Sequence, residues 1–132
     1  MSEEEARLIQ QNQFIKLCGI QLLEDPEGSY YAQARVTPQV HNPYGIVHGG
    51  LLYTMADMVS GATARQYGPH PVTLDSDLHF LRNVSSGTLT ARAEPVRVGG
   101  SVAVLRARVC CGDELLAEGT FTFFYRREKK QN

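Results

Sequence analysis

The sequence has few cysteines, no long apolar run and no excess of either charge. The three cysteines, Cys18, Cys110 and Cys111, are odd in number and lack zinc-finger spacing, so neither a disulfide framework nor a structural metal is expected. No stretch approaches the ~20 consecutive apolar residues of a membrane-spanning helix. The formal net charge of -1 does not indicate nucleic-acid binding or a general attraction to membranes. The start, MSEEEARLIQQ, is acidic where a secretory signal is basic, and we expect a cytoplasmic protein without cofactors.

A chain of 132 residues has room for one domain, which we place at residues 1–132. Ser2 and Glu5 form a capping box and Gly19 is a suitable stop, so a first helix is predicted over about residues 3–18. Turn-forming residues separate six segments of strand character: 20–24, 29–36, 72–81, 88–98, 102–110 and 115–126. One long apolar helix among about six antiparallel strands predicts an α+β fold, in which a curved sheet wraps around the helix. The basic stretch at 126–130 is predicted to be a solvated end.

The long helix is predicted over about residues 48–66, and one carboxylate interrupts its apolar sequence. From Leu51 to Ala64, apolar residues cover nearly every face, which is typical of a buried helix. Asp57 lies about two turns from the start, too far in to cap the amino end. Because burying an unpaired carboxylate is costly, Asp57 needs hydrogen-bonding partners or a chemical role. The helix pattern leaves both interpretations open: a structural aspartate bonded to backbone or to a neighbouring subunit, and a catalytic carboxylate.

Two glycines, Gly49 and Gly50, stand at the start of this helix and allow another chain or a ligand to approach the backbone. The first N–H groups of a helix have no intrahelical partner, and with the helix dipole they suit a developing negative charge. An amide donor at Gly49 and a carboxylate at Asp57 are two halves of a hydrolytic site. Eight residues of helix span about 12 Å, however, which is too far for both to reach one carbonyl. A symmetric dimer would solve this by facing Asp57 of one subunit with Gly49 of the other.

The central motif is Asn42, Gly45, His48-Gly49-Gly50 and then Ala56-Asp57. It resembles the hot-dog-fold acyl-coenzyme A thioesterases of the 4-hydroxybenzoyl-CoA thioesterase superfamily, in particular the PaaI-like branch named after phenylacetate degradation. The similarity continues over residues 71–82, 97–101 and 115–123. It implies a hot-dog fold, with the curved sheet wrapped around the central helix.

The resemblance also implies a reaction, the hydrolysis of a thioester between an acyl group and coenzyme A. Asp57 would act as general base on a water or attack the carbonyl directly. The Gly49 amide would polarise the thioester oxygen, a contribution of about 3 kcal/mol per donor in other acyl-transfer enzymes. In this family Asn42 would orient the thioester or the water, His48 would lie near the sulfur, and Thr73 would help to hold the water. His48 could instead hydrogen-bond backbone in its loop.

Strand alternation raises a difficulty for Thr73. It places Thr73 with Asp75, Asp77 and His79 on one face of a strand, opposite the apolar Leu74, Leu78 and Phe80. Thr73 then faces away from the core unless a bulge or a dimer interface intervenes. The outer pair of Asp75, Asp77 and His79 lies ~13 Å apart, which is too far for one metal ion to bind all three. A solvated or subunit-contact face is the better interpretation.

Coenzyme A is expected to bind near a glycine-rich turn and several basic residues. By family analogy and phosphate charge, the substrate-binding candidates are Gly50, Arg82, Arg97, Gly99, Gly100 and Ser101. Relatives often carry a basic residue where Gly100 stands, so nucleotide contacts are expected to be weaker or differently placed here. Each arginine alone could equally be an ordinary surface charge.

Three functions compete on this sequence. We predict a homo-oligomeric acyl-coenzyme A thioesterase with its site between subunits, a dimer or, as a family expectation, a homotetramer built as a dimer of dimers. A hot-dog enoyl-CoA hydratase or dehydratase is the enzymatic alternative, and a non-catalytic acyl-CoA binding or sensing module is the other. No G-x-S-x-G motif for a serine hydrolase is present, and neither Cys110 nor Cys111 stands at a helix start that would activate it. The acyl specificity, whether aromatic, short or medium, is left open.

Overall fold

The computed structural model describes residues 1–126, which form three α-helices, a short 3-10 helix and six strands. In chain order these are α1 (Glu3–Gln11), α2 (Gln13–Cys18), β1 (Ile20–Glu24), β2 (Tyr30–Arg35), η1 (Pro38–Val40), α3 (Gly49–Ala64), β3 (Pro71–Phe80), β4 (Thr88–Val98), β5 (Val102–Cys111) and β6 (Glu114–Tyr125). Within that range, no helix is long and apolar enough to cross a membrane. The predicted solvated end at 127–130 lies outside the described residues.

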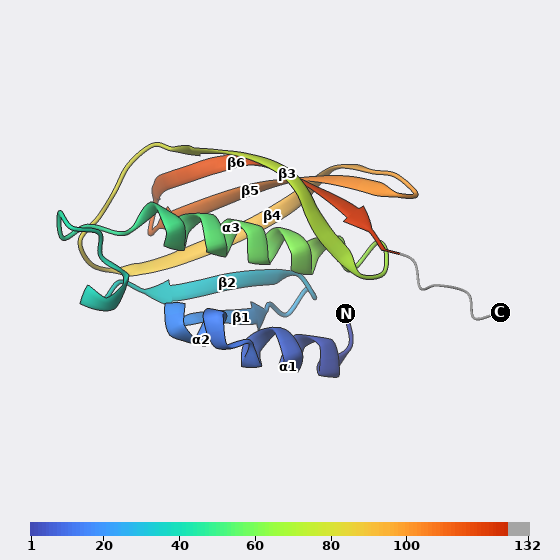
Figure 1. Cartoon of the computed structure of the whole chain (residues 1–132), viewed down its shortest axis with the longest axis horizontal. Helices are drawn as coiled ribbons and strands as arrows, with labels where there is room; N and C mark the ends of the chain where they lie inside the picture. The colour runs from blue at the N-terminus through green and yellow to red at the C-terminus, as the bar shows by residue number, and fades with distance from the viewer. Residues whose placement is uncertain (127–132) are drawn as a thin grey trace.

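The six strands form one antiparallel sheet in the order β1-β2-β4-β5-β6-β3. The sheet curves around α3, as Figure 1 shows, and every strand except β1 has extensive contacts with this helix. The predicted α+β arrangement of about six antiparallel strands around one long helix is confirmed. Two strands, β1 and β3, lie at the ends of the order, so each has one free edge.

The core lies between the concave face of the sheet and α3. Leu52, Met55 and Val59 of the helix are fully buried, as are Leu105 and Phe121 of the sheet. Alternate residues of β5 and β6 point at the helix, which gives these strands their regular alternation of buried and partly exposed positions. The apolar sequence of α3 is therefore explained by packing against a sheet that curves around it.

The amino-terminal segment forms two helices, not the single helix predicted over residues 3–18. The helix breaks at Asn12, whose side chain accepts hydrogen bonds from the first amides of α2. Ser2 caps α1 by accepting from the Glu5 amide at 3.1 Å, as predicted. The Glu5 carboxylate, however, pairs with Arg65 at 3.0 Å and so joins α1 to the end of α3. Gly19, with φ of 71°, ends α2 in the left-handed conformation that glycine adopts easily.

Candidate active site

Asp57 lies in the middle of α3 and, among residues 1–126, has one side-chain hydrogen-bond partner, Thr73 of β3. The Thr73 hydroxyl donates to the Asp57 carboxylate with an oxygen–oxygen distance of 2.6 Å. Burial raises the pKa of the Asp57 carboxyl, and the hydrogen bond from Thr73 opposes part of that increase. A carboxylate that is partly desolvated and held by a single hydroxyl is a base with a raised proton affinity. The pair has the composition of a site for activating water.

A β-bulge explains how Thr73 reaches the helix. Thr73 pairs with Phe123, but Asp75 pairs with Thr122, so Leu74 has no partner in the register between β3 and β6. The extra residue reverses the alternation, and Thr73 shares the helix-facing side with the buried Phe123. The prediction that Thr73 shares a face with Asp75 is therefore wrong. The bulge is the exception under which Thr73 faces the core.

Asp75, Asp77 and His79 lie together on the opposite side of β3 from the helix. The Asp77 carboxylate and the His79 ring come within 3.7 Å of each other, and both side chains are mostly exposed. Within residues 1–126, no three histidine, cysteine, aspartate or glutamate side chains are grouped so that they could hold a metal ion.

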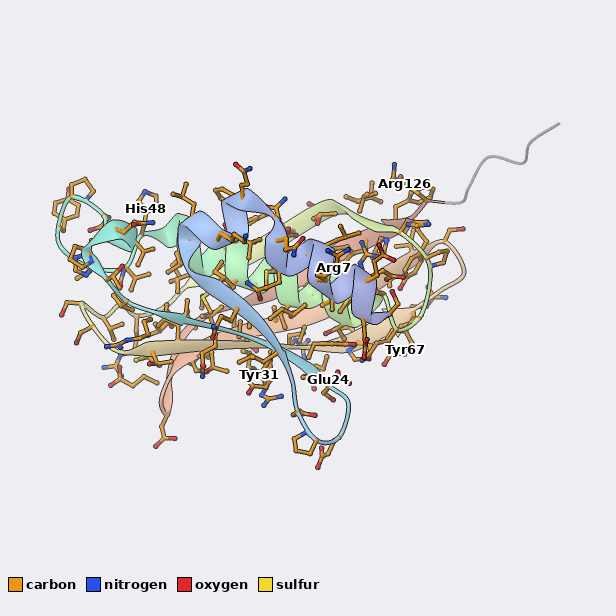
Figure 2. The ribbon with its side chains drawn as sticks, turned by 90° about the horizontal axis from the view of Figure 1, so that it is seen from below. Arg7, Glu24, Tyr31, His48, Tyr67 and Arg126 are labelled. Atoms are coloured by element: carbon orange, nitrogen blue, oxygen red, sulfur yellow. The ribbon has the colours of Figure 1, made fainter. Side chains whose placement is uncertain are left out.

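A cleft of about 720 Å³ runs between α3 and the amino-terminal helices, and Asp57 is part of its wall. Most of the lining is apolar or aromatic, contributed by Leu8, Ile9, Phe14, Ile15, Tyr53 and Met58. Figure 2, seen from below, shows α1 and α2 in front of α3. Asp57 and Thr73 thus meet beside a mostly apolar space of the size that ligand pockets have.

His48 caps the amino end of α3. Its Nδ1 accepts a hydrogen bond from the Gly50 amide at 2.9 Å, so His48 caps the helix and carries its proton, when neutral, on Nε2. The Gly49 amide has no hydrogen-bond partner within the part of the chain that the structure describes. Phe80 lies over Gly49, because a Cβ placed there would be 3.4 Å from the phenyl ring. The amide donor predicted from the sequence is thus present beside an aromatic ring.

Asn42 organises the loop that precedes this helix. Its Oδ1 accepts from the amides of Tyr44 at 2.9 Å and Ile46 at 3.4 Å, and Gly45 takes a positive φ of 78° in the turn. The His48 amide in turn donates to the Val40 carbonyl at 2.8 Å, which closes the loop against the chain. The side-chain oxygen of Asn42 is therefore engaged in the loop, whereas its amide nitrogen Nδ2 donates to no group in the described part of the chain and remains for a substrate.

The predicted site residues form two groups at opposite ends of the sheet. Arg82 lies near Leu116 at one end of β6, where its guanidinium is 3.6 Å from the Glu114 carboxylate. The turn of Gly99, Gly100 and Ser101 lies at the other end, where the Tyr125 amide bonds the Ser101 carbonyl. The strand from Ala117 to Phe124, seven residue steps long, separates them by about 23 Å.

Each group contains some of the predicted catalytic residues. Asn42, His48, Gly49 and Gly50 lie at the Arg82 end, because the Val47 amide bonds both the Val84 carbonyl and the Asn83 side chain. Asp57 and Thr73 lie toward the glycine-rich turn, as does Arg97, which pairs with Val104 near the end of β4. Figure 2 likewise shows His48 at one end of the molecule and Tyr67, just beyond α3, near the other. One protomer does not bring the two groups together.

Sequence reasoning missed Tyr53 as a site residue. Its hydroxyl hydrogen-bonds the Ser76 hydroxyl of β3, and its ring packs 5.4 Å from that of Phe121 between ring centroids. Tyr53 precedes Asp57 by four residues and therefore shares its helix face, a spacing that could have identified it. The contribution of Phe14 and other amino-terminal residues to the cleft has no local sequence signal, because it depends on where α1 and α2 pack.

Comparisons with known proteins agree with this architecture. Residues 44–118, more than half of the chain, match the family described as "Thioesterase superfamily". A 1,4-dihydroxy-2-naphthoyl-CoA hydrolase of Listeria monocytogenes is 27% identical over 116 residues, covering 85% of this chain and 94% of that protein. A Bacillus halodurans protein crystallised with CoA has a TM-score of 0.83 and 26% identity, covering 96% of this chain and 89% of that one. A mutant of the phenylacetic acid degradation protein PaaI of Thermus thermophilus has a TM-score of 0.79 and 26% identity, covering 87% and 100%. The chain therefore belongs to the thioesterase superfamily, has the hot-dog fold and is a thioester hydrolase.

Proposed function

We propose that this protein hydrolyses acyl-coenzyme A thioesters to the free acid and coenzyme A. The observation that carries the proposal is the hydrogen bond between Asp57 and Thr73, which holds a carboxylate of raised pKa at the wall of a mostly apolar cleft. The named activity of the Listeria relative and the CoA bound to the Bacillus halodurans protein support coenzyme A as the carrier of the acyl group. The PaaI neighbour supports an aromatic acyl group such as phenylacetyl as one candidate.

In the proposed reaction, Asp57 removes a proton from a water held with the help of Thr73, and the water oxygen bonds to the thioester carbonyl carbon. The negative charge that develops on the carbonyl oxygen is stabilised by the Gly49 amide at the positive end of α3. The carbon–sulfur bond then breaks, and the coenzyme A sulfur leaves with the proton that Asp57 took from the water. In the alternative route Asp57 attacks the carbonyl carbon itself, and the carbon–sulfur bond breaks with release of the coenzyme A thiolate. Water then hydrolyses the resulting anhydride to the free acid and the Asp57 carboxylate, and its proton neutralises the thiolate.

The proposed substrate contacts follow from the loop before α3. The free Nδ2 group of Asn42 would orient the thioester or the water. His48 already caps the helix through Nδ1, so any contact with the sulfur would come from Nε2. This structural task favours the thioesterase over a hydratase, in which a histidine has to exchange protons during the reaction.

The site is proposed to form between two subunits. On α3, Gly49 and Asp57 are eight residues and about 12 Å apart. β3 is an edge strand that exposes Val72, Leu74 and Phe80, which makes it suitable for pairing with a second copy. A symmetric antiparallel pairing would place the Phe80 end of one β3 beside the Pro71 end of the other. The Gly49 amide would then approach Asp57 of the partner subunit, and two such dimers would form the tetramer.

Coenzyme A is proposed to bind across the same interface. The two groups of candidate residues, Gly50 with Arg82 and Arg97 with the turn at 99–101, lie about 23 Å apart in one protomer. The antiparallel pairing brings one group from each subunit together. Arg82 and Arg97 would then contact the phosphates with a total charge that neither group supplies alone.

Release of free thiol from a panel of aromatic and aliphatic acyl-CoA esters tests this function. The wild type is expected to hydrolyse at least one class of ester, and Asp57→Ala, folded and in the same oligomeric state, is expected to lose at least about 100-fold in kcat/KM. Thr73→Ala serves as the intermediate case, because it removes the partner and leaves the carboxylate. Binding of the esters by the wild type without release of thiol would exclude the thioesterase and favour a sensing module.

A further inference from the structure

The outer wall of the cleft beside Asp57 is formed by α1 and α2. Leu8 of α1 and Phe14 of α2 line the cleft, although more than half of each side chain is exposed to solvent. Opposite them stands Met58 of α3, one residue beyond Asp57. Large apolar side chains that line an open cleft are stabilised when an apolar ligand covers them. The composition of this wall therefore suits an apolar ligand.

Side chains of α1 fix this part of the wall to the rest of the molecule at two places. The Gln10 side chain of α1 forms two hydrogen bonds with the backbone of β1, donating to the Ile20 carbonyl at 2.9 Å and accepting from the Leu22 amide at 2.7 Å. At the start of α1, Glu5 pairs with Arg65 beyond the end of α3 at 3.0 Å. These bonds attach α1 to the sheet edge and to the end of the central helix, and the cleft lies between α1 and α3.

The cleft extends from Asp57 to the ion pair of Glu5 and Arg65. Glu5, Arg65 and Asp57 all line it, and Asp57 and Arg65 are eight residues apart, or about 12 Å along the helix direction. An extended alkyl chain advances about 1.25 Å per carbon, as tetrahedral carbons about 1.5 Å apart require, so this length accommodates about nine carbons. A charged pair at the far end disfavours an apolar chain that would extend beyond it, because covering Glu5 and Arg65 with hydrocarbon removes their water.

We propose that α1 and α2 form the acyl-binding wall, and that the preferred substrates carry apolar acyl groups, aromatic or of medium chain length, that end at the Glu5–Arg65 ion pair. The inference rests on the proposed function for its thioester and coenzyme A. The occupant is the acyl group of the substrate, because the cleft reaches Asp57. Among its described lining residues, the only carboxylates are Asp57 and Glu5, and Glu5 is paired with Arg65. The amino-terminal helices thereby determine acyl specificity.

Leu8 and Leu17 provide a matched pair of variants. Both are leucines on the amino-terminal helices and are similarly exposed, at 58% and 63%, but Leu8 lines this cleft and Leu17 does not. Calorimetry would measure the binding of S-methyl-CoA and S-octyl-CoA, two thioethers that cannot be hydrolysed, to the wild type, Leu8→Trp and Leu17→Trp. The octyl chain has seven carbons more than methyl, and each fully buried methylene adds up to about fourfold in affinity. Because the cleft is open and buries each methylene only in part, about twofold per carbon is expected, which gives an octyl advantage of about 100-fold in the wild type.

The expected result is that Leu8→Trp reduces this octyl advantage to below tenfold, because the indole fills the cleft, while S-methyl-CoA binds as before. Leu17→Trp is expected to keep the full advantage. Leu8→Ala, which shortens the wall without filling the space, should reduce the advantage several-fold. An unchanged octyl advantage in Leu8→Trp would overturn the inference. An unchanged advantage with an altered oligomeric state would overturn it in favour of a second copy of the chain as the occupant.

These measurements test the acyl-binding wall independently of the proposed hydrolysis. Because the thioethers bind without being cleaved, loss of the octyl advantage in Leu8→Trp supports the wall even if the wild type releases no thiol from acyl-CoA esters. That combination would refute the proposed hydrolysis alone. Conversely, an active wild type whose octyl advantage is the same in Leu8→Trp keeps the hydrolysis and refutes the wall.

Discussion

Replacing Asp57 by asparagine is expected to abolish hydrolysis and at the same time stabilise the fold at neutral pH. Asparagine has the shape of aspartate, and its side-chain oxygen can still accept the hydrogen bond from Thr73, which is 2.6 Å long in the wild type. The variant therefore leaves no cavity and no unpaired hydroxyl. What it removes is a negative charge that burial disfavours.

The size of the effect follows from two opposing contributions. Removing a partly desolvated charge recovers about 2 kcal/mol. Exchanging a charge-assisted hydrogen bond for a neutral one loses about 1 kcal/mol. The net expectation is a variant more stable by about 1 kcal/mol, which raises the Tm of a domain of this size by about 4 °C. Such gains are common where a functional group has been kept at the expense of stability.

The gain in stability from Asp57→Asn is expected to depend on pH. The pKa of Asp57 is higher in the folded chain than in the unfolded chain, so the folded state binds the proton more tightly. The charge destabilises the fold fully above the raised pKa. The destabilisation disappears as the pH falls through that pKa toward the unfolded value of about 3.9. The advantage of Asp57→Asn should therefore be largest near pH 7.5 and shrink toward pH 4.

Thermal unfolding of wild type and Asp57→Asn at several pH values and at one protomer concentration would measure this difference. Thiol release at pH 7.5 would show the accompanying loss of activity, at least about 100-fold. A variant that is equally or less stable at pH 7.5, or whose advantage does not change with pH, would refute the argument that Asp57 carries an uncompensated desolvation cost.

Three further outcomes follow from the geometry. Thr73→Val removes the hydroxyl that lowers the pKa of Asp57, so the acidic limb of the kcat/KM profile should move to higher pH; an unmoved limb would separate Thr73 from the base. His48→Ala should destabilise the fold by about 1 kcal/mol in denaturant titrations, whereas His48→Asn, whose side chain can cap the helix, should keep most of the wild-type stability. Equal losses of stability in the two variants would exclude a capping role for His48. Gly119→Ala should cost about 3 kcal/mol or more by the same assay, since its Cβ would lie 1.9 Å from the Asp77 carbonyl oxygen; a small loss would mean that β3 and β6 separate easily.

Most of the fold could be predicted because local rules and tertiary structure agree. The helix predicted over about residues 48–66 is Gly49–Ala64 in the structure, and the strand predicted over 88–98 is Thr88–Val98. Turn residues mark these boundaries, and the apolar pattern of the central helix predicts burial. The structure buries most of α3 against the sheet and leaves the face of Tyr53, Asp57 and Met58 at the cleft. The first helix was less predictable, because Asn12 can occupy either a helix interior or a cap and only packing decides between them.

The candidate site was predictable in composition and only partly in geometry. Asp57 could be singled out because a carboxylate in an apolar helix contradicts its surroundings. Thr73 was placed on the wrong face, because alternation assumes a regular strand and a bulge at Leu74 carries no clear local signal. His48 and Asn42 were expected near the substrate, and the structure adds a structural task for each, as a helix cap and as the centre of a turn.

The sequence by itself determined the strand and helix order, the burial of the central helix and the anomalous carboxylate within it, since all of these follow from periodicity and from the cost of desolvating a charge. Only the tertiary structure decided that Thr73 meets Asp57, that Glu5 crosses to Arg65, and that the amino-terminal helices form one side of the cleft. These contacts join residues far apart in the chain, and they depend on register and packing direction. Such features are set by the sum of many weak contacts, which no local pattern records.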